Sequence, residues 1–107
     1  MRVELDVFSG RPNPVWQLDA QAAAALTALH DALIAGAGWR EPPALGYRGF
    51  LYAIRADGCR ASHGAVRTPH AILADPRQTI ERFLIARLPR DWVGLVPMIE
   101  DTLRPRE

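Results

Sequence analysis

The segment SGRPNPVW, residues 9–16, restricts the fold more than any other part of this chain. Each proline fixes its own φ and pushes the residue before it toward an extended conformation, so Arg11 and Asn13 are both restricted. Gly10 can adopt backbone angles that are closed to other residues. No helix or central strand can therefore run through this segment, and we expect a stiff loop that presents a guanidinium, an amide and an indole.

An alternating pattern precedes this loop. Within residues 2–8, the two valines and the leucine alternate with polar residues, among them Glu4 and Asp6. This period is typical of a strand with one buried face. We predict a strand here, with its valine and leucine side chains toward the core and the two carboxylates toward solvent.

An alanine-rich segment follows the loop. Residues 20–35 place apolar side chains at helical spacing, and their alanine content favours a helix. Asp19 is a suitable N-cap, and Gly36 and Gly38 provide an end. We therefore predict the longest helix of the chain over residues 20–35.

Two shorter helices are predicted in the C-terminal third of the chain. The pair Asp75-Pro76 indicates a helix start, with aspartate as the N-cap and proline in the first turn, and Pro89 ends this helix. Residues 91–103 also keep helical spacing. Pro97 either kinks this last segment or splits it into two.

The middle of the chain has the pattern of a β-hairpin. Residues 47–56 and 59–67 are predicted strands, and Asp57-Gly58 between them is a typical two-residue turn. The element order is then β-α-β-β-α-α. We predict a single α+β domain over residues 1–107, in which helices pack on one face of a three-stranded antiparallel sheet. Such a sheet has exposed edges, which proteins either cover or use.

Composition excludes several classes of function. The formal net charge is +1, and all 13 basic residues are arginine, so we expect no nucleic acid and no anionic membrane as partner. The single cysteine cannot form an intrachain disulfide. No segment has the apolar core of a signal peptide or the ~20 apolar residues of a membrane span, and we expect a cytoplasmic protein.

Candidate metal ligands and nucleophiles are poorly spaced. Cys59 and His63 on a regular strand would lie ~13 Å apart, and neither they nor His70 belongs to a CxxC or HxxxH motif. Ser62 and His63 are adjacent, so a strand would point them to opposite faces. We therefore expect no metal, no cofactor and no recognisable nucleophilic site.

The loop at residues 9–16 is the first candidate binding segment. Arg11 suits a carboxylate and Asn13 suits amide-type hydrogen bonds, both on a rigid mount that lowers the entropy cost of binding. Trp16 adds a large aromatic surface. A structural alternative stays open, in which Asn13 bonds local backbone and Trp16 packs in the core.

The segment LGYRGF, residues 45–50, is the second candidate. Its glycines on either side of Tyr47 and Arg48 allow close approach to the backbone. An aromatic side chain beside an arginine suits a peptide or an anion. The structural alternative here is a loop-to-strand transition with a bulge.

Together the two segments resemble those of a known group. DVFSGRPNPVW followed by LGYRGF is similar to small, mostly uncharacterised microbial proteins that carry FSGRPNPxW and a later LGYRGF. The resemblance covers residues 5–16 and 45–50. The resemblance also links this chain to partner proteins of peptide-modifying multinuclear non-haem iron enzymes. It implies a binding role rather than catalysis.

We therefore expect a non-catalytic accessory protein that recognises a peptide segment or a partner enzyme in the biosynthesis of modified peptides. A free sheet edge would take the peptide as an added strand. The predicted binding residues are Arg11, Asn13, Trp16, Tyr47 and Arg48. Two other hypotheses stay open. One is a small cofactor-free enzyme at the same loop with His63 or His70 as general base, and the other is an oligomer, such as a homodimer, whose sheet edges pair.

Overall fold

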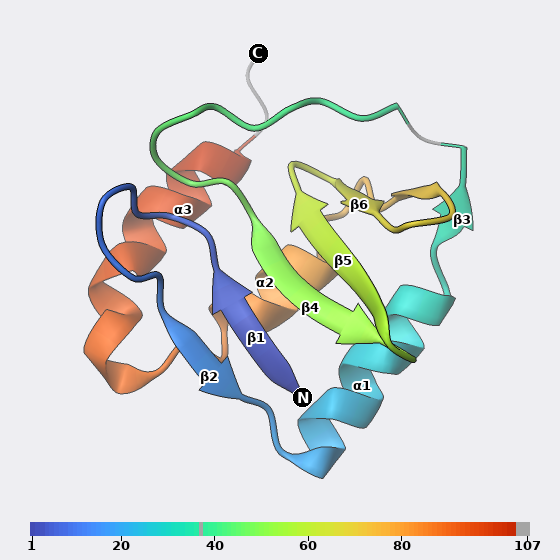
Figure 1. Cartoon of the computed structure of the whole chain (residues 1–107), viewed down its shortest axis with the longest axis horizontal. Helices are drawn as coiled ribbons and strands as arrows, with labels where there is room; N and C mark the ends of the chain where they lie inside the picture. The colour runs from blue at the N-terminus through green and yellow to red at the C-terminus, as the bar shows by residue number, and fades with distance from the viewer. Residues whose placement is uncertain (37, 105–107) are drawn as a thin grey trace.

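The chain folds around an antiparallel sheet of seven strands, in the order β2-β1-β4-β5-β6-β7-β3. The computed structural model describes residues 1–36 and 38–104. The strands are β1 (Arg2–Leu5), β2 (Val15–Gln17), β3 (Ile34–Ala35), β4 (Phe50–Ile54), β5 (Asp57–Ser62), β6 (Ala65–Arg67) and β7 (Ile72–Ala74). The helices are α1 (Ala20–Asp31), α2 (Thr79–Ile85), the 3-10 helix η1 (Arg90–Leu95) and α3 (Val96–Leu103). Figure 1 shows the helices behind the sheet, with α2 behind β4 and β5.

The prediction of an α+β fold is confirmed, whereas the prediction of a three-stranded sheet is wrong. Strands β2, β3 and β7, which were missed, are two or three residues long. Segments this short show no alternation that a sequence pattern can reveal. The predicted strand over residues 59–67 is in fact β5 and β6, because His63 and Gly64 between them have φ values of 51° and 81° and reverse the chain.

The first helix begins where it was predicted and ends earlier. The Asp19 carboxylate accepts a hydrogen bond from the Ala22 amide at 2.7 Å and caps α1. The helix ends at Asp31 rather than at residue 35, because Ile34–Ala35 pair with β7 as strand β3. At 12 residues α1 is nevertheless the longest helix described. In the described ranges, no helix combines the length and apolarity needed to cross a bilayer.

The central hairpin pairs as predicted, but its turn lies elsewhere. Strands β4 and β5 are antiparallel, and Ile54 faces Asp57 at the end of the ladder. The turn residues are therefore Arg55 and Ala56, whose φ values of 48° and 72° suit a two-residue hairpin turn. Asp57-Gly58 belongs to β5. The Arg55 guanidinium binds the Asp31 carboxylate of α1 at 2.6 Å, and this contact favours the turn at residues 55 and 56.

The second helix begins later than predicted, although its predicted cap is used. Asp75 lies before the helix, and its carboxylate accepts hydrogen bonds from the amides of Thr79 and Ile80, each at 3.0 Å. Helix α2 therefore starts at Thr79. The last predicted helix is split, since η1 ends at Leu95 and α3 places Pro97 in its first turn.

The core lies between the sheet and the helices. The inward direction predicted for the first strand is confirmed, since Val3, Leu5 and Val7 are all buried. Other large core side chains include Leu26, Phe50, Ile80, Leu84 and Ile99. Asp6 was predicted to face solvent, yet it is only 8% exposed. The reason is a set of polar partners from distant segments, which forms the centre of the candidate site.

Candidate functional site

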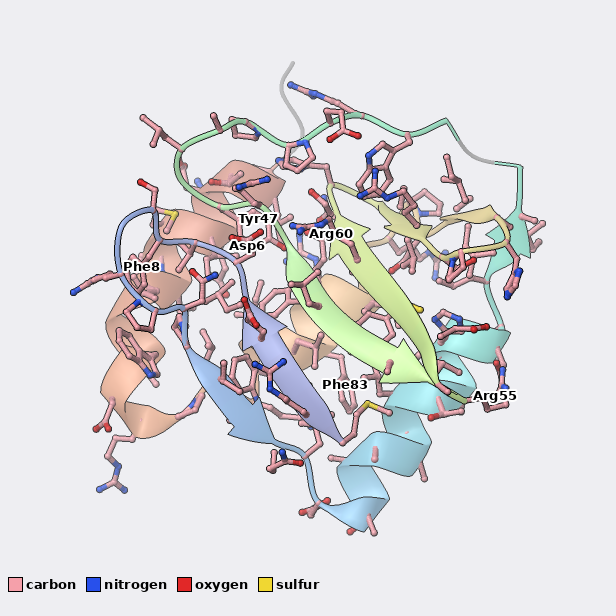
Figure 2. All side chains as sticks on the ribbon, viewed as in Figure 1. Asp6, Phe8, Tyr47, Arg55, Arg60 and Phe83 are labelled. Carbon is pink, nitrogen blue, oxygen red and sulfur yellow. The ribbon has the colours of Figure 1, made fainter. Side chains whose placement is uncertain are left out.

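The chain just after β1 is bonded through its backbone to the LGYRGF segment. Backbone hydrogen bonds link the Asp6 amide to Gly49 O at 2.9 Å and the Arg48 amide to Asp6 O at 2.8 Å. The end of β1 and the LGYRGF segment therefore run side by side. Figure 2 shows Asp6, Tyr47 and Arg60 close to one another at this end of the sheet.

Asp6 is the centre of a polar network on the face of the sheet that lies away from the helices. Its carboxylate binds the Arg60 guanidinium of β5 at 2.8 Å and lies 3.8 Å from Arg48 Nε. The Asn13 amide also donates to Asp6, at 3.3 Å. Arg60 in addition donates to the Arg48 carbonyl at 2.8 Å. These contacts connect the loop at residues 9–16, the LGYRGF segment and β5.

Asn13 is used within the protein. Its Oδ1 accepts hydrogen bonds from the amides of Val7 and Phe8 at 3.1 and 2.8 Å. Its Nδ2 donates to Glu4 at 3.1 Å, in addition to Asp6. The side chain therefore closes the loop onto the end of β1, which is the structural role that sequence analysis left open.

Arg11 and Arg48 are the two charged candidate residues, and they differ in exposure. Arg11 is exposed, and its guanidinium lies 3.8 Å from the centre of the Phe8 ring. The Phe8 ring in turn contacts Trp92 of η1, with 5.6 Å between ring centres. The Arg48 side chain is 41% exposed. The Arg11 guanidinium is therefore placed to meet a ligand, whereas the Arg48 side chain is partly exposed and turns its Nε toward Asp6.

Trp16 and Tyr47 contribute to the interior. Trp16 is half-buried and lies edge-on against Phe50, with 6.3 Å between ring centres. Tyr47 is buried, and its hydroxyl donates to the Glu81 carboxylate at 2.5 Å. Burial, and then the charge of Glu81, raises the pKa of Tyr47 well above its ordinary value. Tyr47 is therefore a neutral hydrogen-bond donor.

Glu81 is a buried polar residue that sequence analysis missed. It is 1% exposed, and its second carboxylate oxygen accepts a hydrogen bond from the Gly64 amide at 2.9 Å. The sequence spacing of Glu81 from the apolar residues of α2 indicated that it would be buried. Glu81 precedes Leu84 and Ile85 by three and four positions, so it lies on the apolar face of α2. The carboxylate thus holds the β5–β6 turn against LGYRGF.

The remaining titratable candidates lie apart from this network. Cys59 is buried in β5, and burial raises the pKa of its thiol. His70 lies 3.3 Å from the Asp57 carboxylate. Among residues 1–36 and 38–104, no group of three or more His, Cys, Asp and Glu side chains has the arrangement of a metal site.

Ser62 and His63 do not point to opposite faces as predicted. The positive φ of His63 takes it out of the strand, and its Nδ1 lies 2.8 Å from Ser62 Oγ. Ser62 itself is 2% exposed. The pair therefore orients the imidazole but offers no accessible hydroxyl.

The edge formed by β2 has unused backbone groups. The Leu18 amide donates to Met1 O at 2.8 Å, which makes these two residues a hydrogen-bonded pair. Such pairs alternate with non-hydrogen-bonded pairs along an antiparallel ladder. Val15 and Gln17 therefore turn their N–H and C=O groups away from β1. In the part of the chain that the structure describes, no strand pairs with this side of β2.

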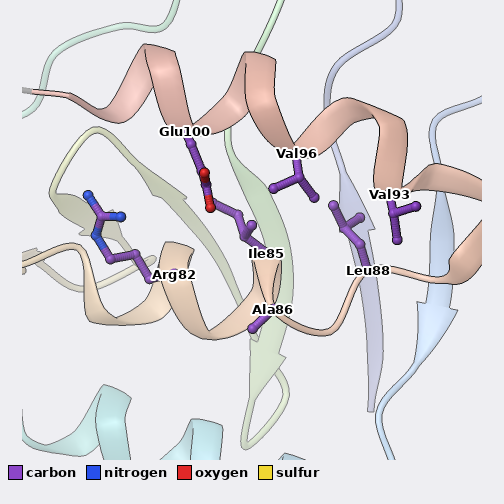
Figure 3. A pocket seen from close by; sticks show the side chains of 7 residues that line it. All are labelled: Arg82, Ile85, Ala86, Leu88, Val93, Val96 and Glu100. Atoms are coloured by element: carbon purple, nitrogen blue, oxygen red, sulfur yellow. The ribbon is translucent and has the colours of Figure 1, made fainter.

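A groove of about 330 Å³ lies between α2 and the C-terminal helices. Figure 3 shows Ile85 and Leu88 opposite Val93 and Val96, with Arg82 and Glu100 toward one end. Its lining is mostly apolar, and Arg82 and Glu100 are its charged side chains.

A matched pair of substitutions separates structure from recognition in the loop. Asn13→Ala is expected to lower the free energy of unfolding by about 2 kcal/mol, because two backbone amides lose their acceptor. Arg11→Ala should cost less than ~1 kcal/mol, since an exposed cation–π contact contributes about 0.5–1 kcal/mol. Urea denaturation of both variants measures the difference. Equal losses would place Arg11 in the same internal network as Asn13.

Comparison of the chain with protein-family models, with curated proteins and with solved structures finds no match.

Proposed function

We propose that this protein is a non-catalytic recognition module that binds an extended peptide segment of a partner along the free edge of β2. The observation that carries the proposal is the outward direction of the backbone groups of Val15 and Gln17. Val15 and Gln17 are two positions apart, so their outward N–H and C=O groups can form with a peptide the hydrogen bonds that pair neighbouring antiparallel strands. Val15 is 44% exposed, which leaves room for an added strand.

The charges near this edge favour a segment with acidic groups. Arg2 lies opposite Gln17 in the β1–β2 ladder; its side chain is 60% exposed and lies 3.3 Å from the Glu4 carboxylate. Arg11 is exposed in the loop that leads into β2. An arginine binds a carboxylate through two parallel hydrogen bonds. We therefore expect a peptide with Asp or Glu, or with its C-terminal carboxylate, near the edge.

The resemblance of residues 5–16 and 45–50 suggests the first partners to test. These are a peptide-modifying enzyme and the short peptide that it modifies, if neighbouring genes encode them. The role of this protein would then be to hold the peptide in extended form while a separate enzyme performs the chemistry.

The experiment uses peptides selected on the intact protein from a library of extended sequences, together with any peptide from a neighbouring gene. Val15→Pro removes one outward N–H without breaking the ladder to β1, and Pro14 before it is already restricted to an extended conformation. Val15→Ala also removes the valine side chain but keeps the backbone N–H of residue 15. We expect Val15→Pro to weaken peptide binding at least tenfold and Val15→Ala to change it less than threefold.

Amide hydrogen exchange gives an independent measurement. The Val15 and Gln17 amides should exchange rapidly in the free protein and slow down when a peptide is added. Protection that appears on raising the protein concentration alone, with a dimer mass, would assign the edge to self-pairing and contradict the proposal. Equal binding by Val15→Pro and Val15→Ala would contradict it as well.

A further inference from the structure

A separate cavity of about 710 Å³ lies among four segments of the chain. This volume falls within the range of small-molecule sites, about 300–1,000 Å³. The segments are the loop before β4, the β5–β6 turn, the β7–α2 connection and the C-terminal end of α3. The lining residues that matter for binding are Arg40, Glu41, His63, Gln78, Leu103 and Arg104.

The histidine of this cavity is held in one orientation. His63 has a φ of 51°, and its Nδ1 is engaged by Ser62 at 2.8 Å. Its ring lies against Tyr47, with 5.8 Å between ring centres. The next residue, Gly64, is fixed through its amide by the buried carboxylate of Glu81. These contacts leave Nε2 as the ring nitrogen available to a ligand.

The cavity carries a positive balance of charge. Arg40 and Arg104 are both exposed, and neither forms an ion pair with a residue that the structure describes. The Glu41 carboxylate already accepts hydrogen bonds from Arg67 at 3.1 Å and from Trp39 at 3.0 Å. The guanidinium groups of Arg40 and Arg104 are therefore available to a ligand. A guanidinium group binds carboxylate or phosphate through paired hydrogen bonds.

Two residues of the cavity have a left-handed backbone conformation. Non-glycine residues with positive φ in the described ranges are Arg55, Ala56, His63 and Gln78. Two of these four, His63 and Gln78, line this cavity. The Gln78 side chain also donates to Leu103 O at 2.9 Å and connects two of the walls. Such strain persists where the surroundings enforce it, and it is common at ligand sites.

We propose that this cavity binds a small molecule with at least two anionic groups, carboxylate or phosphate. Arg40 and Arg104 bind the anionic groups, and His63 Nε2 forms a hydrogen bond to the ligand between them. The site goes beyond peptide recognition at β2 and does not depend on it. Its chemistry is that of a small polar anion rather than of an extended chain.

The test uses citrate as a carboxylate probe and inorganic pyrophosphate as a phosphate probe, each titrated into the full chain by calorimetry. We expect saturable binding of one of them, at one molecule per chain. Arg40→Gln and Arg104→Gln should each weaken this binding at least tenfold. Arg90→Gln is the matched control, because Arg90 is an exposed arginine of η1 outside the cavity, and it should leave the affinity within twofold.

A third variant tests the histidine. His63→Asn keeps a side chain that tolerates the left-handed backbone but removes the imidazole ring. We expect at least fivefold weaker binding with little change in melting temperature, and a shift of the His63 ring signals in NMR when the probe is added to the parent protein. Absence of saturable binding by both probes would overturn the proposal. An equal loss in Arg90→Gln, which would indicate general charge attraction, would overturn it as well.

Discussion

Replacing Gly49 with alanine is expected to lower the free energy of unfolding by about 4 kcal/mol and the melting temperature by about 15 °C. Gly49 has a φ of 103°, which an L-residue rarely adopts. A Cβ at this position would also overlap the carbonyl oxygen of Ala61 in β5. Both effects destabilise the start of β4, because Gly49 immediately precedes this strand and its carbonyl accepts a hydrogen bond from the Asp6 amide.

Gly46→Ala is the matched control in the same segment. Gly46 also has a positive φ, 88°, but a Cβ there would meet no atom within 4 Å. This variant should therefore cost only the backbone strain, about 1–2 kcal/mol. Thermal and urea denaturation of both variants separate the two terms. Equal losses would show that the approach of β5 to Gly49 is not tight, and would contradict the prediction.

The second large effect is expected at Glu81. Glu81→Ala removes the acceptor of the buried Tyr47 hydroxyl and of the partly buried Gly64 amide, and it leaves both donors without a partner. Each unsatisfied donor costs about 1–3 kcal/mol, so we expect a total loss of about 4 kcal/mol in the free energy of unfolding. Urea denaturation measures this loss, with an unchanged slope showing that the folded state is intact.

Two further variants define the network around Glu81. Tyr47→Phe removes one donor and should cost about 1–2 kcal/mol. When Glu81→Ala is made in that background, it should cost less than in the parent protein, because one of the two orphaned donors is already gone. Strictly additive losses would show that Tyr47 and Glu81 do not stabilise each other. A loss below ~1 kcal/mol for Glu81→Ala would contradict the network as a whole.

The parts of the fold that were predictable have local causes. The Asp19 cap, the inward valines and leucine of β1 and the pairing of β4 with β5 follow from short patterns. The missed features depend on distant residues. The hairpin turn lies at Arg55 and Ala56 rather than at Asp57-Gly58, and Arg55 is held by Asp31 of another element. Ile34–Ala35 leave the helix because β7 pairs with them.

The candidate site shows the same division. From the sequence, Arg11 and Asn13 were predicted equally as binding residues. In the structure Arg11 is exposed, whereas Asn13 accepts hydrogen bonds from the amides of Val7 and Phe8. Alternation indicated the face of the sheet on which Asp6 lies. It did not indicate that Arg60 would cover it from a position 54 residues further along the chain. The orientation of His63 depends on a left-handed turn at His63 and Gly64, and the glycine alone did not locate this turn within the predicted strand over residues 59–67.

The position of β1 has a consequence for the order in which the protein folds on the ribosome. This strand is made before the other six strands, yet it lies between β2 and β4, so one of its edges stays unpaired until residues 50–54 have emerged. The Asp6 carboxylate stays without its closest cationic partner for longer still, because that partner is Arg60. Contacts this distant in sequence slow folding. The nascent N-terminal half therefore carries an open strand edge through much of its synthesis, and chaperone contact during translation should concentrate there.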